Sequence, residues 1–208
     1  GIINCPINKN LLQNAKVGVT EYLAFKCGIK NKSEVMLIRN KKISVSPITT
    51  HIDVKNISKQ IKKEIIITKI KTINKWFKKF YKKKPKIGIL GLNPHNAEFR
   101  VNSEENNEII PAIKKLKETG IKLDGPLSSD TVFINNYKNY NVIVGMYHDQ
   151  VLTPFKAIFK FDAINITLGL KYLRISPDHG VAINLIGQNK ANPKSLINCI
   201  DFINKFGK

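Results

Sequence analysis

The stretch NVIVGMYHDQ, residues 141–150, contains the pattern that decides the fold. Its short apolar run, residues 142–146, is followed at once by polar residues, which is typical of a buried strand that delivers functional side chains at its carboxyl end. Two further stretches repeat this pattern: KIGILGL at residues 86–92, closed by an Asn-Pro turn signal, and AINITLGL at residues 163–170. We therefore expect several buried strands of the same kind.

Helical segments alternate with these strands. Residues 53–84 are rich in lysine, and their isoleucines recur at the i, i+4 spacing of one helix face, which predicts one or two amphipathic helices. Two more helices are expected at residues 108–119, ended by a left-handed Gly120, and at residues 193–206, opened by a proline at the first helical position.

Strands that alternate with helices predict an α/β fold with a largely parallel sheet, in which ligands bind at the carboxyl ends of the strands. The chain has 208 residues, which suits one large domain or two small ones. We find no internal repeat and no linker composition, so the sequence reveals no domain boundary within residues 1–208.

The net charge of +20 raises the alternative of a nucleic-acid-binding module, centred on the lysines of residues 55–86. Arginine, the usual residue for phosphate and base contacts, occurs only three times, so a solvated lysine surface that attracts an anionic substrate is the favoured interpretation. Single-strand binders need aromatic stacking platforms. The aromatic side chains of this region have the i, i+4 spacing of a helix core face, and they are Trp76, Phe77, Phe80 and Tyr81.

The cysteines predict neither a disulfide framework nor a metal site, because Cys5, Cys27 and Cys199 are odd in number and share no C-x-x-C spacing. A reducing cytosol fits this usage best. No apolar run approaches the length of a membrane span, and the first residues lack a signal-peptide pattern, so we expect neither a membrane partner nor secretion.

Three histidines are candidate metal ligands. His51 follows a Thr-Thr pair, His95 closes GLNPH and His148 lies in MYHDQ, so each is expected in a loop at a strand end. Neutral imidazole is the commonest ligand for borderline transition metals, and three protein ligands with one open position form a catalytic zinc site. The spacing of the three matches no short metal motif, and on spacing alone ordinary loop histidines are the favoured interpretation.

Five segments resemble the 4-hydroxythreonine-4-phosphate dehydrogenase family in order and separation, and they are GLNPH, DGPLSSDT, MYHDQ, NITLGL and DHGVA. The resemblance runs from NCPINK, at residue 4, to the end of the chain. It implies an αβα-layered fold like that of isocitrate and isopropylmalate dehydrogenases, consistent with the lack of a GxGxxG fingerprint after any strand. Residues 1–208 then correspond to the C-terminal two thirds of the family, without the N-terminal portion that forms one wall of the cofactor cleft.

The resemblance also implies the site residues. The metal ligands would be His51, His95 and His148, with one of the three supplied by the other subunit of a homodimer. It implies substrate contacts at Thr20, Lys156, Asn165 and Arg174. It implies an active-site aspartate at Asp130 and a cofactor loop at Asp178, His179 and Gly180. Lysine and arginine pair with phosphate or carboxylate. Taken alone, Lys156 is typical of a surface lysine, Asp130 of a turn or helix cap, and residues 179–180 of an ordinary turn.

The implied reaction is the NAD- or NADP-dependent oxidation of 4-phosphooxy-L-threonine to 2-amino-3-oxo-4-phosphonooxybutanoate. This product decarboxylates to 3-amino-2-oxopropyl phosphate in pyridoxal phosphate biosynthesis. All-imidazole ligation suits zinc best, with cobalt, nickel or, less well, magnesium as alternatives.

One departure affects the substrate. The family has a histidine at Val19, before the retained Thr20, and valine has no donor for a phosphate or carboxylate. A sister activity on threonate or erythronate 4-phosphate is therefore a second hypothesis.

Overall fold

The carboxyl ends of four parallel strands form one edge of a single mixed sheet in the computed structural model, which describes residues 1–7, 18–29, 32–134 and 136–206. The strands are β1 (Ile2–Ile3), β2 (Val35–Arg39), β3 (Ser44–Pro47), β4 (Ile87–Leu90), β5 (Leu123–Leu127), β6 (Val142–Gly145), β7 (Ile164–Leu168) and β8 (Arg174–Pro177). Their order in the sheet is β1-β8-β7-β2-β3-β6-β4-β5. The parallel set is β3, β6, β4 and β5, whereas β2 runs antiparallel to both of its neighbours.

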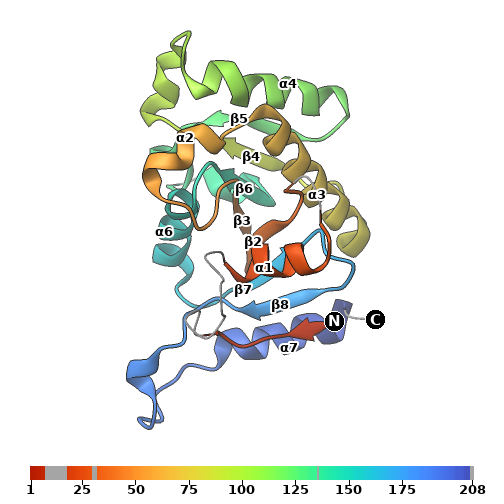
Figure 1. Ribbon diagram of the computed structural model, residues 1–208, viewed down its shortest axis with the longest axis vertical. Coiled ribbons are helices and arrows are strands. Elements are labelled where there is room, and N and C mark those ends of the chain that lie inside the picture. Colours follow the sequence, from red (N-terminus) through yellow and green to blue (C-terminus); the bar gives the residue numbers. More distant parts are fainter. Residues whose placement is uncertain (8–17, 30–31, 135, 207–208) are drawn as a thin grey trace.

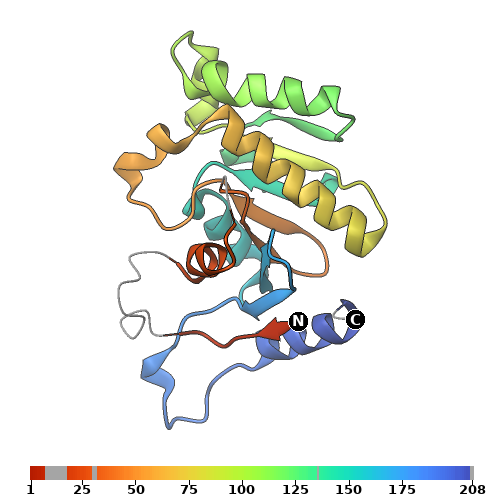
Figure 2. The ribbon, with the colours of Figure 1, turned by 45° about the vertical axis from the view of Figure 1, so that its right-hand side comes forward.

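Helices cover both faces of this sheet (Figures 1 and 2). They are α1 (Val19–Lys26), α2 (Ile57–Gln60), α3 (Lys63–Tyr81), α4 (Ile110–Glu118), α5 (Ser129–Val132), α6 (His148–Phe159) and α7 (Lys194–Phe206). One apolar cluster joins α3, α4 and α7 to one face, and a second cluster joins α5 and α6 to the other. The expected α/β class and αβα layering are confirmed.

Strand register explains why one part of the sheet remains uncovered by apolar side chains. Successive residues of a strand point to opposite faces. Along β7, the buried isoleucines 164 and 166 join the cluster under α3 and α7, while Asn165 and Thr167 point to the opposite face. Arg174 of β8 pairs with Thr167, and Ser176 pairs with Asn165, so polar side chains of two strands line up on the face that α6 only partly covers.

Helix α3 shows how the lysine-rich segment folds. Its isoleucines at positions 66, 70 and 73 are fully buried, and its lysines at positions 71, 75, 78 and 79 are exposed. Trp76 and Phe77 are buried as well, and the Trp76 ring stacks on Phe202 of α7 with 6.3 Å between ring centroids. These aromatic rings form part of the core, as the i, i+4 spacing predicts, and therefore do not form an exposed stacking platform.

Most predicted elements are confirmed, with two corrections at helix starts. The strand expected within residues 163–170 is β7, and the sheet is mostly parallel as expected, with antiparallel pairs among β3, β2, β7 and β8. The first turn of the helix expected from residue 108 is a π-helix, Glu105–Ile109, that leads into α4. Pro193 lies just before α7, where its carbonyl accepts a bond from the Ile197 N–H, instead of at the first helical position. No helix in the described part of the chain has the length and apolarity needed to span a membrane.

Candidate active site

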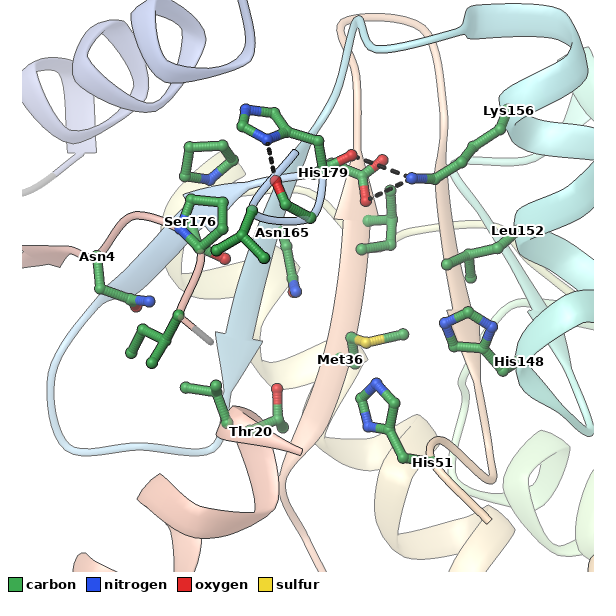
Figure 3. A pocket seen from close by; sticks show the side chains of 18 of the residues that line it. Asn4, Thr20, Met36, His51, His148, Leu152, Lys156, Asn165, Ser176 and His179 are labelled. Atoms are coloured by element: carbon green, nitrogen blue, oxygen red, sulfur yellow. Dashed lines mark hydrogen bonds and ion pairs between the residues drawn. The ribbon is translucent and has the colours of Figure 1, made fainter. Parts of the chain in front are cut away.

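Parallel strands bring two of the candidate histidines together. His51 follows β3, and His148 is the first residue of α6, directly after β6. Because β3 and β6 are parallel neighbours, their carboxyl ends meet at one edge of the sheet. The two imidazole rings lie 5.7 Å apart between centroids, and both face the same cleft (Figure 3).

His95 lies apart from this pair. It follows β4, which is separated from β3 by β6, and it is exposed in a short 3-10 segment, Pro94–Phe99. Within the described residues, no group of three His, Cys, Asp or Glu side chains is arranged to hold a metal ion. One copy of the chain thus brings together two of the three expected imidazole ligands.

The cleft beside the two histidines has a volume of about 590 Å³. It lies over polar side chains of β7 and β8 and over Met36 and Ile38 of β2, with the N-terminus of α1 on one side and α6 on the other (Figure 3). Nine of the residues expected from the sequence line it, namely Thr20, His51, His148, Lys156, Asn165, Arg174, Asp178, His179 and Gly180. His95 and Asp130 do not line it.

Two cationic side chains, Arg174 and Lys156, line this cleft. Arg174 is only 3% exposed, and its guanidinium donates from Nε to Asn4 Oδ1 at 2.6 Å and from Nη1 to Thr167 Oγ1 at 3.0 Å. Burial lowers the pKa of Arg174 below its usual value. Lys156 reaches into the cleft from α6 (Figure 3). A buried, oriented guanidinium and a nearby ammonium suit a phosphate or a carboxylate.

Asp178 orients Lys156 and has a free oxygen. Its Oδ1 lies 3.4 Å from Lys156 Nζ, which also donates to the Asp178 carbonyl at 3.0 Å. Its Oδ2 is buried and has no hydrogen-bond partner among the described residues, and the same is true of Asn165 Oδ1. Burial raises the pKa of the Asp178 carboxyl, and Lys156 offsets part of that increase. Because buried polar atoms are normally paired, both oxygens are candidate ligand contacts.

The loop after β8 has less defined features. His179 Nδ1 lies 2.9 Å from the carbonyl oxygen of Gly180, which is a local contact of adjacent residues. A Cβ at Gly180 would meet no atom within 4 Å, so the backbone there is open to an approaching ligand. The arrangement allows a cofactor contact and is equally typical of an exposed turn.

A second group of side chains lies at the carboxyl ends of β4 and β5. Residues 95–99 all have positive φ, between 48° and 58°, a conformation that costs roughly 1–2 kcal/mol for each residue with a side chain. The fully buried Glu105 supports this segment, because its Oε1 accepts the backbone N–H groups of Leu92 and Asn93, each at 2.8 Å. Asn96 connects it to the carbonyl of Pro126 at 3.3 Å.

Asp130 belongs to this second group. It lies in the short helix α5, which contacts the 3-10 segment of His95, and its side chain is exposed. The described residues give it no side-chain cap bond within α5, so the helix-cap interpretation is not supported. His95 and Asp130 therefore form a separate exposed group at the same edge of the sheet as the cleft.

Gln150 connects segments beside the site, a role that the sequence did not predict. Its amide is buried and joins three loops: Oε1 accepts Met146 N–H at 2.6 Å, and Nε2 donates to Gly91 O and to Ser129 Oγ, each at 2.7 Å. These loops carry His148, His95 and Asp130. The one feature of the sequence that could have indicated this role is the position of Gln150 two residues after His148 in MYHDQ.

Comparison with known proteins identifies the family. The family model described as pyridoxal phosphate biosynthetic protein PdxA matches residues 1–203. The chain belongs to the PdxA family. A PdxA relative from Sulfurihydrogenibium sp. (strain YO3AOP1), named 4-hydroxythreonine-4-phosphate dehydrogenase, is 45% identical over 205 residues, which cover 96% of this chain and 63% of the relative. A relative of the same name from Aquifex aeolicus (strain VF5) is 41% identical, over 98% of this chain and 64% of its own length.

A solved PdxA structure agrees with the fold. The crystal structure of 4-hydroxythreonine-4-phosphate dehydrogenase from Klebsiella pneumoniae superimposes with a TM-score of 0.81 at 31% identity, covering 96% of this chain and 61% of that one. The chain thus spans a little over three fifths of the length of the relatives it matches. The resemblance seen in the motifs is confirmed.

Proposed function

We propose that this chain provides the metal- and substrate-binding part of a dehydrogenase that oxidises 4-phosphooxy-L-threonine with NAD or NADP. The observation that carries the proposal is the shared cleft, which is lined by two neighbouring imidazoles, the buried Arg174 and Lys156. That arrangement suits a small substrate with a hydroxyl group at a metal and an anionic group on the cations. The names of the relatives point to the same substrate.

The donor set fits a divalent metal such as zinc. Each of the two cleft histidines has its Nδ1 near a carboxylate oxygen: His148 Nδ1 lies 2.7 Å from Asp149, and His51 Nδ1 lies 3.6 Å from Glu21. A carboxylate at one ring nitrogen is the usual companion of a histidine that binds metal through the other. His51 and His148 would hold the ion, and a third imidazole would complete the set.

We propose that a second copy of the chain supplies this third imidazole from His95. Exposed apolar side chains surround the segments involved: Val54 is 80% exposed near His51, and Val101 is 80% exposed near His95. Further exposed apolar residues in these segments and after Asp130 are Ile52, Phe99 and Ile134. Exposed apolar side chains in both segments are a feature that an interface between two copies would bury. A homodimer that buries these apolar side chains would also bring Asp130 of one chain to the cleft of the other.

Each residue has a role in this scheme. Arg174 and Lys156 bind the phosphate and carboxylate, while Thr20 and Asn165 offer neutral hydrogen bonds to the body of the substrate. Asp130 of the partner subunit would lie near the substrate carbon that is oxidised and would act as the catalytic carboxylate. A metal held by these histidines would supply Lewis acidity at the substrate hydroxyl, and a nicotinamide cofactor would supply the hydride acceptor. The loop of Asp178, His179 and Gly180 is the proposed contact of that cofactor.

Val19 supports a second candidate substrate. It lines the cleft beside Thr20, where it offers an apolar surface and no hydrogen bond. A four-carbon sugar acid phosphate, threonate or erythronate 4-phosphate, lacks the amino group of 4-phosphooxy-threonine and retains the groups that Arg174 and Lys156 would bind. The three free thiols, at Cys5, Cys27 and Cys199, fit a reducing compartment such as the cytosol.

Two experiments test the proposed function. NAD⁺ or NADP⁺ reduction is followed at 340 nm with each phosphorylated substrate in the presence of Zn²⁺, and inactivity toward 4-phosphooxy-threonine beside activity toward threonate 4-phosphate would favour the second candidate. The shared site is tested by mixing a His51→Ala chain with a His95→Ala chain. Neither homodimer has a complete site, but a mixed dimer regains one, so recovery of Co²⁺ binding on mixing is expected. No recovery contradicts the shared site.

A further inference from the structure

The N-terminal turn of α1 encloses one of the cleft histidines. Glu21 lies in this turn, and its side chain is 24% exposed. Its Oε1 accepts a hydrogen bond from the Thr50 hydroxyl, the residue just before His51. Its Oε2 is buried, lies 3.6 Å from His51 Nδ1 and has no hydrogen-bond partner among the described residues. The carboxylate therefore touches the histidine loop through one oxygen and faces the imidazole with the other.

Gly18 permits this close packing. A Cβ at position 18 would lie 2.3 Å from His51 Nδ1 and 2.5 Å from Glu21 Oε2, distances that no side chain can adopt. The backbone N–H of Tyr22 bonds to the Gly18 carbonyl at 3.0 Å, so the glycine is fixed at the start of the helix. The helix terminus, the carboxylate and the imidazole ring thus fit together without spare space.

We propose that Glu21 is a positioning residue: its unpaired Oε2, which faces His51 Nδ1, favours the ring form with the proton on Nδ1 and so leaves Nε2 as the metal-binding nitrogen of the cleft. The hydrogen bond made by one ring nitrogen determines which nitrogen carries the proton. Buried carboxylates in this role orient the ring and increase its basicity as a ligand. The inference concerns the His51 ring, and its metal-binding consequence rests on the proposed function.

The other cleft histidine provides an internal comparison. His148 Nδ1 also faces a carboxylate, that of Asp149, at 2.7 Å. Asp149 is 77% exposed, so water competes for its oxygens, whereas the Glu21 side chain is 24% exposed and accepts a hydrogen bond from Thr50. Electrostatic attraction is stronger where water is excluded. The His148 contact is the shorter of the two, and the His51 contact is the better shielded from water.

The first test reads the His51 tautomer in the metal-free chain by ¹⁵N NMR at a pH where the ring is neutral. The wild-type chain is expected to have the proton on Nδ1. Glu21→Gln keeps the shape but loses the charged acceptor, and it should shift the population toward the Nε2–H form. A wild-type ring with its proton on Nε2, or an unchanged ring in Glu21→Gln, overturns the proposal.

Two further variants keep this test decisive. Glu64→Gln removes an exposed carboxylate from the first turn of α3 and should leave the His51 signals unchanged. Thr50→Val keeps Glu21 but removes the hydroxyl that fixes its Oε1, so a smaller shift toward Nε2–H is expected. If Glu21→Gln fails to fold, the Thr50→Val result decides, and an unchanged tautomer there overturns the proposal.

The second test measures Co²⁺ affinity by its visible absorption in the assembled chain. Loss of a carboxylate behind a ligating histidine typically weakens metal binding about 10- to 100-fold. Glu21→Gln is expected to fall in this range and Glu64→Gln to match the wild-type chain; equal affinity of Glu21→Gln and wild type overturns the metal-binding consequence. If the wild-type chain shows the Nδ1–H tautomer but binds no Co²⁺, the proposed function fails while the assignment of Glu21 stands.

Discussion

Replacing Gln150 by leucine should destabilise the chain far more than an ordinary surface change. The substitution keeps the side-chain volume but removes the amide that joins the three segments at the sheet edge. It leaves the buried Met146 N–H and Gly91 carbonyl without partners, while the half-buried Ser129 hydroxyl can turn to water. Each unpaired buried group costs roughly 1–3 kcal/mol. Leucine recovers about 1 kcal/mol through added apolar burial, so we expect a net loss of about 3 kcal/mol.

Urea unfolding followed by circular dichroism measures this loss. Gln188→Leu is the matched control, because Gln188 is exposed and its Nε2 bonds only to the nearby Asn184 carbonyl. That control should change the free energy of unfolding by no more than about 0.5 kcal/mol. Hydrogen exchange should also speed up at the Met146 amide. A loss below about 1 kcal/mol in Gln150→Leu would refute the idea that its amide holds the three loops together.

Three further predictions follow from the same geometry. Gly18→Ala should displace the His51 ring and weaken Co²⁺ binding at least tenfold while circular dichroism still reports a folded chain, and unchanged affinity would contradict the contact distances. Arg174→Gln should abolish measurable binding of inorganic phosphate in calorimetry, whereas Lys138→Gln, on the exposed surface, should leave it unchanged. Burial lowers the pKa of Lys69, so the folded chain releases this proton before the unfolded chain does, and stability should rise with pH toward 10.5. Urea melts at several pH values should lack this rise in Lys69→Met.

The strands were predictable because short apolar runs closed by turn residues have few other structural solutions. Residues 142–145 and 87–90 form strands as expected, and the isoleucine spacing of α3 predicts its buried face. The antiparallel pairing of β7 with β8 was not predictable from such runs, because a buried strand has the same composition in either direction. The pairing depends on the tight turn at residues 169–173, where Gly169 has φ +91°.

The strand-end positions of the candidate histidines were predictable from the sequence, but their grouping was not. His51, His95 and His148 all follow strands, as the sequence predicts, and the order of those strands separates them. Because β6 lies between β3 and β4, the loops after β3 and β6 are neighbours, and the loop after β4 is one strand further away. Strand order is a tertiary property that no local pattern contains. Gln150 and Glu21 were missed for a related reason, since their importance lies in the contacts they make across the fold.

Contacts within one chain support both groups of side chains at the sheet edge. Glu21, Gly18 and Thr50 pack around His51, whereas Glu105 and Gln150 bond to the loops that carry His95 and Asp130. Association of preformed surfaces costs less entropy than association that must also order loops. In the proposed dimer, metal and substrate binding would therefore depend on how the two preformed groups dock, and the carboxylates of Glu21 and Glu105 would position the histidines that each chain contributes.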